Sequence, residues 1–474
     1  MGRPARRPLG AAVPRWIPGD AAEEQALLAE LGLRQFDDLF ADIPRKVRLG
    51  RLGLGPGRDE LDVVRAVDKI LDRNRPMGRF ASFLGGRVAH RFQPAAVDAI
   101  VSRSEFYTSY TPYQPEASQG MLQTLFEFQS LWVELTGLDA ANASLYDGAT
   151  AAGEALLLAH RIHPGHRFLV PASLPWEEKS VLANYAAGLP IRIEEIPYDE
   201  RTGRLDLEFV RSAVAEQNVF GLLADVPNGF GHLDEGLWDV KEILGKVPLV
   251  VVADPLALTV LDPPGNWGAD VVVAEGQGFG SSPSFGGPLL GLFACRREHL
   301  RLSPGRIVGA TADAAGRTGF TLTLQTREQH IRRSRATSNI CTNQSLLALA
   351  FVVYASVVGP SGLAALQTRL SERARTLAAA LGSIDGLAAP RFEAPYLGEF
   401  AVEVRGAEAT TFLDRLRRRR VLGGHPLADP RPGATGLPAS LYLTAATEFT
   451  DEKEIQRYAK AARASVGPHR GASS

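Results

Sequence analysis

Between residues 167 and 295 the chain alternates short apolar segments with amphipathic ones, and this alternation limits the fold more than any other feature. The apolar segments are RFLVPA (167–172), IRIEEIP (191–197), VFGLLADVP (219–227), LVVVADP (249–255), DVVVAEG (270–276) and LLGLFAC (289–295). Amphipathic segments, such as DLEFVRSAVAEQN (206–218), separate several of them. Unbroken apolar strands alternating with helices are typical of a parallel sheet covered on both faces. The pattern predicts an α/β fold with a mainly parallel central sheet.

The segments on either side follow other patterns and divide the chain further. Helical periodicity in AAEEQALLAELG (21–32) and LDVVRAVDKILDRN (61–74) predicts a helical N-terminal arm. Short strands and helices after about residue 400 predict a small α+β domain, whose last helix we expect to begin with Thr450 as N-cap. The expected divisions are a disordered leader at 1–13, the helical arm at 14–80, the large α/β domain at 81–365 and the small α+β domain at 366–474.

Composition and hydropathy argue against several classes of protein. The net charge of −1 gives no electrostatic reason to expect a nucleic-acid or membrane partner. The apolar segment QSLLALAFVVYASVVG (344–359) is shorter than the ~20 residues that span a bilayer, so a buried core helix is expected. Two cysteines exclude a disulfide framework, and nine histidines without HxH or HExxH spacing give no support for a metal site. We expect reduced thiols and a cytoplasmic protein.

The segment YDGATAAGEA (146–155) brings glycine and threonine to the predicted start of a helix. Free N–H groups of Gly148, Ala149 and Thr150 would form an anion site suited to a phosphate. The alternative is ordinary helix capping by Asp147.

Two further features lie at the ends of predicted strands. Asp254 ends one strand, where α/β folds bind ligands, although an Asp that caps a turn before Pro255 is an equal alternative. The loop VVVAEGQGFGSSPSFGGP (271–288) has the composition of an active-site loop, but apart from Glu275 it holds no acid, base or strong nucleophile. Both features lie at the edge where such folds keep their chemistry.

The order of these features resembles that of pyridoxal-phosphate (PLP) enzymes of fold type I. In those enzymes a helix start holds the phosphate, an Asp pairs with the pyridine nitrogen, and a Lys forms the Schiff base. The lysine position falls near Gln277 or Gly278, and the chain has no lysine between residues 247 and 452. This chain therefore cannot form the aldimine at that position.

Two polar or aromatic segments are candidates for an interface or a binding pocket. In SEFYTSYTPYQPEASQG (104–120), Pro112 and Pro115 stiffen a loop that carries the tyrosines Tyr107, Tyr110 and Tyr113. The alternative is a packed surface loop.

The second segment is REQHIRRSRATSNICTNQ (327–344). Its Arg332 and Arg333 can hold a carboxylate or phosphate bidentately, or they form a solvated basic face. Cys341 is expected to be a buried small residue, since no activating partner can be identified.

Together these stretches resemble the glycine-cleavage P-protein family, and most closely the N-terminal half-protein, subunit 1 or alpha, of organisms that divide it in two. The resemblance covers residues from about 14 to 465, and its longest block runs from 304 to 344. The segments that carry it are SRSEFYTSYTPYQPEASQG, NASLYDGATA, DPPGNWGADVVVAEGQ, SFGGPLLG, PGRIVGATADAAGRTGFTLTLQTREQHIRRSRATSNICTNQ and GGHPL (423–427).

The resemblance implies an oxidoreductase of glycine catabolism that binds glycine on PLP, decarboxylates it and passes the aminomethyl group to the lipoyl arm of the H-protein. In the divided enzymes the beta subunit supplies the lysine and pairs with alpha, typically as an α2β2 heterotetramer. PLP is therefore expected on the beta subunit and not covalently on this chain, with lipoate supplied through the H-protein. The expected partners are the beta subunit, the H-protein and glycine, and this chain is not expected to act alone.

The resemblance also assigns the site residues. No catalytic residue is expected here, because Gln277 or Gly278 stands at the lysine position. A vestigial cofactor site would comprise Gly148, Thr150 and Asp254. The residues expected to shape the partner's active site are Tyr107, Tyr110, Tyr113, Arg332, Arg333, Thr337, Ser338 and Asn339.

The sequence also differs from the family's usual pattern in three places, at VAHRFQP (88–94), at SLPWEEKSVL (173–182) and at Gly229. These differences leave open a divergent non-catalytic binding or regulatory homologue that no longer forms the glycine-cleavage complex. A self-contained PLP transferase is a third reading, against which the missing lysine argues.

Overall fold

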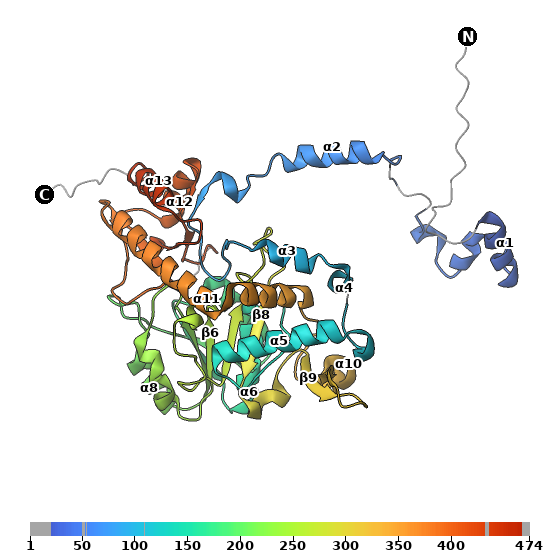
Figure 1. Ribbon diagram of the computed structural model, residues 1–474, viewed down its shortest axis with the longest axis horizontal. Helices are drawn as coiled ribbons and strands as arrows, with labels where there is room; N and C mark the ends of the chain where they lie inside the picture. The colour runs from blue at the N-terminus through green and yellow to red at the C-terminus, as the bar shows by residue number, and fades with distance from the viewer. Residues whose placement is uncertain (1–19, 50–52, 54, 109, 432–435, 467–474) are drawn as a thin grey trace, which may run out of the picture. The chain divides into compact units, whose positions relative to one another are not determined.

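The computed structural model describes residues 20–49, 53, 55–108, 110–431 and 436–466 (Figure 1). The leader expected at 1–13 lies outside these residues. The chain forms two compact units, Met1–Arg75 and Pro76–Ser474. The finer divisions expected from the sequence remain predictions.

The first unit contains the two helices predicted for the N-terminal arm. Helix α1 (Ala21–Glu30) begins after Asp20, whose side chain accepts hydrogen bonds from two backbone N–H groups of the first turn. Helix α2 (Glu60–Leu71) begins in the same way after Asp59. The aspartates satisfy N–H groups that a helix start leaves without internal partners.

A seven-stranded sheet forms the centre of the second unit. Its strands are β2 (Ala140–Ala141), β3 (Arg167–Pro171), β4 (Arg192–Ile196), β5 (Val219–Val226), β6 (Leu249–Ala253), β7 (Val271–Glu275) and β8 (Gly291–Cys295). They lie in the order β2-β8-β7-β6-β5-β3-β4, and β3 to β7 run parallel. Strand β8 runs antiparallel to β7, because a loop without a crossover helix joins the two. The predicted mainly parallel sheet is confirmed.

Helices cover both faces of this sheet, as the unbroken apolar strands require. They are α5 (Gln119–Thr136), α6 (Gly148–Ile162), α7 (Trp176–Ala186), α8 (Leu207–Ala215), α9 (Val240–Leu244) and α11 (Ser345–Gly382). Along β6, Val250 belongs to the core cluster that includes residues of α6 and α7, whereas Val251 belongs to the cluster that includes residues of α5, α8, α9 and α11. Figure 1 shows α5 and α11 side by side on one face. Alternate side chains of a strand point to opposite faces, so one apolar strand supplies both cores.

Helix α11 combines the two helices predicted at 344–359 and 360–383. Gly359, at φ 71° and ψ 167°, interrupts it just before Pro360. Among the described residues, α11 is the one helix long and apolar enough to cross a membrane, a test that core helices of soluble proteins also pass. Its Phe351 is fully buried between Phe128 and Phe279, so the predicted core packing is confirmed.

A second, antiparallel sheet lies in the C-terminal part. Its strands are β11 (Leu387–Ala388), β12 (Glu399–Val404), β15 (Leu441–Ala445) and β14 (His425–Pro426), in that spatial order. Helices α12 (Ala409–Arg418) and α13 (Glu452–Arg463) accompany it. The N-cap predicted at Thr450 is wrong: Asp451 caps α13 by accepting from Glu454 N, while the buried Thr450 hydroxyl accepts from Thr447 N.

The remaining elements are short. They are β1 (Ala81–Ser82), which pairs with β13 (Val421–Leu422), the hairpin β9 (Ile307–Ala312) and β10 (Thr318–Thr323), and the helices α3 (Ala95–Val101), α4 (Ser104–Tyr107) and α10 (Gln329–Arg332).

Candidate functional site at the carboxyl edge of the sheet

The carboxyl ends of β6 and β7 meet the start of α6, and most of the predicted vestigial site gathers there. Asp254 follows β6, Glu275 ends β7 and Gly148 begins α6. Two neighbouring cavities open at this edge, and Glu275 contributes to both. The parallel sheet causes this meeting, because it brings the carboxyl ends of its strands to one edge.

Glu275 fills the helix start that the sequence predicted as an anion site. Its carboxylate accepts three backbone hydrogen bonds, each 2.9 Å long, from Gly148 N, Gln277 N and Leu290 N. A Cβ atom at position 148 would lie 2.9 Å from both the Cβ and the backbone N of Glu275, so glycine alone permits this approach. Burial raises the pKa of Glu275 to about 7, against the lowering effect of the three N–H groups. The chain's own carboxylate therefore occupies the helix start that the sequence predicted as a phosphate site.

Asp147 and Thr150 form a reciprocal cap at the same helix start. The Asp147 carboxylate accepts from Thr150 N at 2.8 Å, and the Thr150 hydroxyl accepts from Asp147 N at 3.3 Å. The Thr150 hydroxyl also lies 3.0 Å from the Asp147 carbonyl oxygen, to which it donates. This is the helix capping that the sequence offered as the alternative to a phosphate site. The Thr150 N–H and hydroxyl groups are both used in hydrogen bonds to Asp147.

Asp254 and Gln277 are likewise held by their own backbone surroundings. Asp254 Oδ1 accepts a hydrogen bond from Leu256 N at 2.9 Å in a tight turn. Asp254 and Gly278 both line a cavity of about 40 Å³. The fully buried Gln277 side chain accepts from Ala89 N at 3.0 Å and donates to the Ser281 carbonyl oxygen. Of the two residues predicted near the lysine position, Gln277 is thus an amide locked between two backbone groups, and Gly278 has no side chain.

The charged residues that line the larger cavity, of about 390 Å³, are mostly acidic. Arg87, which no sequence motif indicated, lines this cavity and pairs with Glu178 at 2.6 Å and with Asp225 at 3.4 Å. Burial raises the pKa of Asp225 to about 7, while the nearby carboxylates raise the pKa of Arg87. A single arginine gives no sequence signal for such a cluster, because the three members lie far apart in the chain.

The three segments that differ from the resembled family's pattern meet at this cavity. Val88, Pro175, Glu178 and Gly229 all contribute to its wall. At Gly229 a Cβ atom would lie 1.8 Å from the Ser173 carbonyl oxygen, so this backbone accepts no larger residue.

PLP does not fit the residues present at this edge. Its phosphate would face the Glu275 carboxylate at the helix start, and the cavity wall adds Asp147, Glu177 and Glu178. Anions are stabilised where N–H groups and cations converge, and here those groups already serve the protein's own carboxylates. Gln277 offers no amine for a Schiff base.

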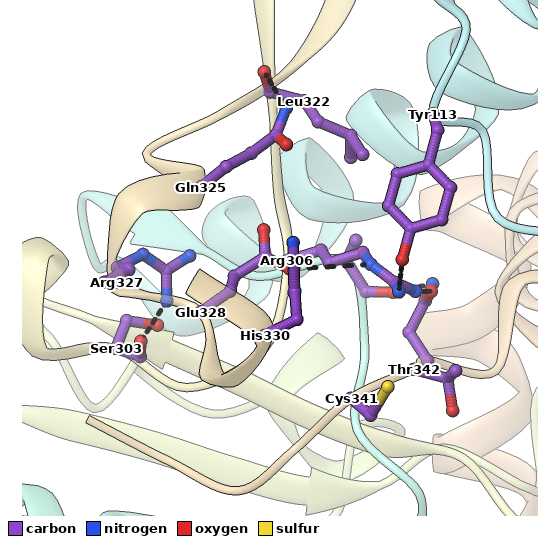
Figure 2. Close-up of polar contacts among 12 residues, drawn as sticks. Tyr113, Ser303, Arg306, Leu322, Gln325, Arg327, Glu328, His330, Cys341 and Thr342 are labelled. Atoms are coloured by element: carbon purple, nitrogen blue, oxygen red, sulfur yellow. Dashed lines mark hydrogen bonds and ion pairs between the residues drawn. The ribbon is translucent and has the colours of Figure 1, made fainter. Parts of the chain in front are cut away.

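A second cluster fixes one of the predicted tyrosines (Figure 2). The buried Arg306 donates to the Tyr113 hydroxyl at 2.9 Å and to Asn343 Oδ1 at 3.2 Å, and its guanidinium lies 5.3 Å from the Tyr113 ring centre. All three tyrosines are exposed, Tyr113 at 51%, Tyr107 at 69% and Tyr110 at 78%. Arg306 was missed in the sequence, where a single arginine before a strand resembles any surface residue.

The predicted Arg/Thr-Ser-Asn segment is largely exposed. Arg332 and Arg333 lie on the surface, and Arg332 donates to the Thr326 carbonyl oxygen at 3.0 Å. Thr337 and Ser338 are half-buried.

The neighbouring Asn339 is exposed, and so is Cys341, contrary to the expected burial. The Tyr146 hydroxyl accepts from Cys341 N at 3.3 Å and holds the chain where Ile340 is buried. Neighbouring residues of such an extended segment point to opposite sides.

The sheet order, the helix start at its carboxyl edge and the place of Gln277 define a chain with the fold of PLP-dependent enzymes of fold type I. Two solved structures share this fold at low sequence identity: a Burkholderia pseudomallei sphingosine-1-phosphate lyase (17% identity, TM-score 0.62, covering 90% of this chain and 94% of that one) and the Escherichia coli cysteine desulfurase CsdA (11%, TM-score 0.58, 82% and 95%).

The chain belongs to the glycine cleavage system P-protein family, whose model matches residues 14–411. It is 42% identical over 451 residues to a probable glycine dehydrogenase (decarboxylating) subunit 1 of Chlorobium chlorochromatii, covering 94% of this chain and 98% of that protein. The corresponding protein of Thermoplasma acidophilum is 39% identical over 441 residues (92% and 98%). A crystal structure of an inhibitor-bound glycine decarboxylase (P-protein) matches with a TM-score of 0.84 and 35% identity, covering 95% of this chain and 99% of that one.

Replacing Glu275 should open the helix start to anions. Glu275→Ala frees three buried N–H groups, which should lower the free energy of unfolding by about 1–3 kcal/mol or more. Inorganic phosphate should then raise the thermal unfolding temperature of the variant beyond its effect on wild type, measured against chloride at equal ionic strength. Glu242→Ala, an exposed change on α9, is the control, and an equal phosphate effect in all three proteins would contradict this assignment.

Glu154 on α6 should make stability depend on pH. It is 1% exposed, and burial raises its pKa from 4.5 to about 7, although Ser338 and Arg161 act in the opposite direction. The folded state therefore holds a proton that the unfolded state has lost, so this contribution is full below about pH 4.5 and disappears as the pH rises through about 7.

Glu154→Gln should accordingly be more stable than wild type at pH 8, by up to about 3 kcal/mol, and the gain should shrink toward pH 5. Urea unfolding across this range measures the effect, with the exposed Glu127→Gln as control. A gain that is constant with pH would refute the role of Glu154.

Proposed function

We propose that this chain is the non-lysine, alpha subunit of glycine decarboxylase. Glycine is decarboxylated on PLP bound to a lysine of the beta subunit, and the aminomethyl group passes to the lipoyl arm of the H-protein. The single observation that carries the proposal is the buried Gln277 amide at the lysine position, in a chain of this family. The chain is inactive alone and works in a cytoplasmic α2β2 assembly.

The exposed aromatic and basic segments support a role at the subunit interface. Tyr107 and Tyr110 are 69% and 78% exposed, while Tyr113 is anchored by the buried Arg306. Aromatic side chains on a fixed loop supply contact area with little loss of freedom, which suits an interface. In this proposal the tyrosines, with Arg332 and Arg333, reach toward the beta active site, orient groups there and exclude water.

One observation favours a second candidate, a divergent binding or regulatory homologue. The segments at 88–94 and 173–182 and the residue Gly229 build an acidic cavity at the former cofactor edge. A chain with this cavity and no beta partner would bind a ligand without catalysing glycine cleavage.

Reconstitution tests the proposed function. The isolated chain should show no aldimine absorbance with PLP and no glycine–bicarbonate exchange, and exchange should appear when a beta subunit and lipoyl H-protein are added. Tyr110→Ala should lower exchange by the assembled enzyme about tenfold, the scale of a central interface side chain, without changing the chain's own unfolding temperature.

The matched control is Leu189→Ala, which removes an exposed apolar side chain between α7 and β4. It should leave exchange unchanged. Exchange by this chain alone would refute the proposal, and failure to bind any beta subunit would favour the regulatory homologue.

A further inference from the structure

A basic surface lies where the C-terminal ends of α12 and α13 come together. Five of the six residues at 415–420 are arginine, although the whole chain has a net charge of −1. The second half of α13 adds further cations, and Figure 1 shows the two helices next to each other. The cationic residues of this basic surface are Arg415, Arg417, Arg418, Arg419, Arg420, Arg457, Lys460 and Arg463.

The fold itself uses some of these cations. Arg415 donates to the Ser465 carbonyl oxygen at 2.9 Å, and Arg419 donates to the Ala464 carbonyl oxygen at 3.2 Å. Both carbonyls lie just past the end of α13, where helix ends leave backbone oxygens without internal partners. Cations at this position are also attracted to the negative end of the helix dipole. Helix capping therefore accounts for part of the basic surface.

Three other cations have no such use. The side chains of Arg418, Arg420 and Lys460 are exposed, and they make no hydrogen bond or ion pair with any residue that the structure describes. Like charges crowded on a surface repel one another, so the fold gains nothing from them. Their charge is therefore available to a group outside the described fold.

Arg420 also stands in a backbone conformation that disfavours it. It follows Arg419, the C-cap of α12, and its φ is 60°. Glycine is the usual residue at this left-handed position, because a Cβ atom meets the following carbonyl oxygen there. The chain thus places an arginine at a conformational cost, although its side chain has no polar contact with the described residues. A side chain that the fold does not need is one that a partner can use.

The acids within the basic surface indicate the class of partner. Asp414 pairs with Arg417 at 2.9 Å, and Glu454 pairs with Arg457 at 3.6 Å. A nucleic-acid backbone carries closely and evenly spaced negative charges, which these two carboxylates would repel. An acidic protein segment carries its carboxylates on flexible side chains at wider spacing and can avoid them. Guanidinium groups bind such carboxylates bidentately.

We propose that the basic surface binds an acidic segment of a partner protein, whose carboxylates contact Arg418, Arg420 and Lys460. The exposed position of these cations makes the interaction sensitive to salt, because ions screen charges that face water. The inference does not rest on the proposed function, and its tests use this chain alone.

Fluorescence anisotropy with the full chain and a labelled 20-residue poly-L-glutamate tests the proposal. The probe should bind in 50 mM NaCl, and its affinity should fall at least about tenfold in 300 mM NaCl. A labelled 20-nucleotide oligouridylate should bind at least about threefold more weakly than poly-L-glutamate. Equal or tighter binding of the oligonucleotide would indicate a nucleic-acid surface and overturn the proposal, and so would a failure of poly-L-glutamate to bind.

Two matched triple variants locate the binding. The combination of Arg418→Ala, Arg420→Gly and Lys460→Ala should weaken poly-L-glutamate binding about tenfold, the summed scale of three exposed ion pairs. The control combines Arg192→Ala, Arg211→Ala and Lys246→Ala, which removes three exposed cations from other elements of the same unit. It should keep the affinity within about twofold of wild type. An equal loss in both variants would show attraction to overall charge and overturn the assignment.

Single changes separate this role from a structural one. Arg420→Gly should keep or raise the unfolding temperature, because glycine suits the left-handed position, and should still weaken binding about twofold. Asp414→Ala, which frees Arg417, should strengthen binding about twofold. A lower unfolding temperature of Arg420→Gly with unchanged binding would give Arg420 a structural role and overturn its assignment.

Sedimentation velocity excludes a second copy of this chain as the acidic partner. The chain should sediment identically in 50 and 300 mM NaCl. A salt-sensitive self-association that the first triple variant abolishes would overturn the proposal of a separate partner protein. Because none of these measurements uses a beta subunit, failed reconstitution and failed binding of the acidic probe are separate results.

Discussion

The contact between the Glu275 carboxylate and the backbone of Gly148 is the interaction on which the arrangement of the site depends. It joins the carboxyl end of β7 to the start of α6, and through Leu290 N it also holds the chain that enters β8. Three N–H groups on one buried carboxylate form a compact joint, and the missing side chain at Gly148 permits the close approach. In doing this the protein uses the end of the sheet as structure, at the edge where open α/β sheets commonly bind ligands.

Three independent features then make the same edge unsuitable for PLP. Gln277 replaces a possible amine with a fixed amide, Glu275 takes the helix start, and acidic residues line the remaining space. The last feature makes the remaining space unfavourable to any anionic ligand.

The second cluster shows how a buried charge can organise an exposed surface. Arg306 lies in the core beneath the tyrosine loop and donates to both Tyr113 and Asn343, which belong to segments far apart in the chain. Arg306 holds the hydroxyl of the half-exposed Tyr113, whereas Tyr110 on the same segment is 78% exposed. An anchored aromatic side chain beside an exposed one suits a protein interface.

The sequence by itself determined the sheet and the absence of the lysine. Continuous apolar strands such as 249–255 bury both of their faces only when helices cover the sheet on both sides. Lysine is absent from 247 to 452, so no fold of the chain can place a lysine of this segment in the site. The exact start of a helix was left open where two neighbouring residues could both cap it, as at α13, where Asp451 is the N-cap in place of Thr450. Only the tertiary structure decided that Glu275 meets Gly148 and that Arg87 meets Glu178 and Asp225, because these partners lie roughly 90 to 140 residues apart. The periodicity of the sequence does not indicate pairs so far apart. The parallel sheet brings its strand ends together, and burial then strengthens the electrostatic interactions between their charged groups.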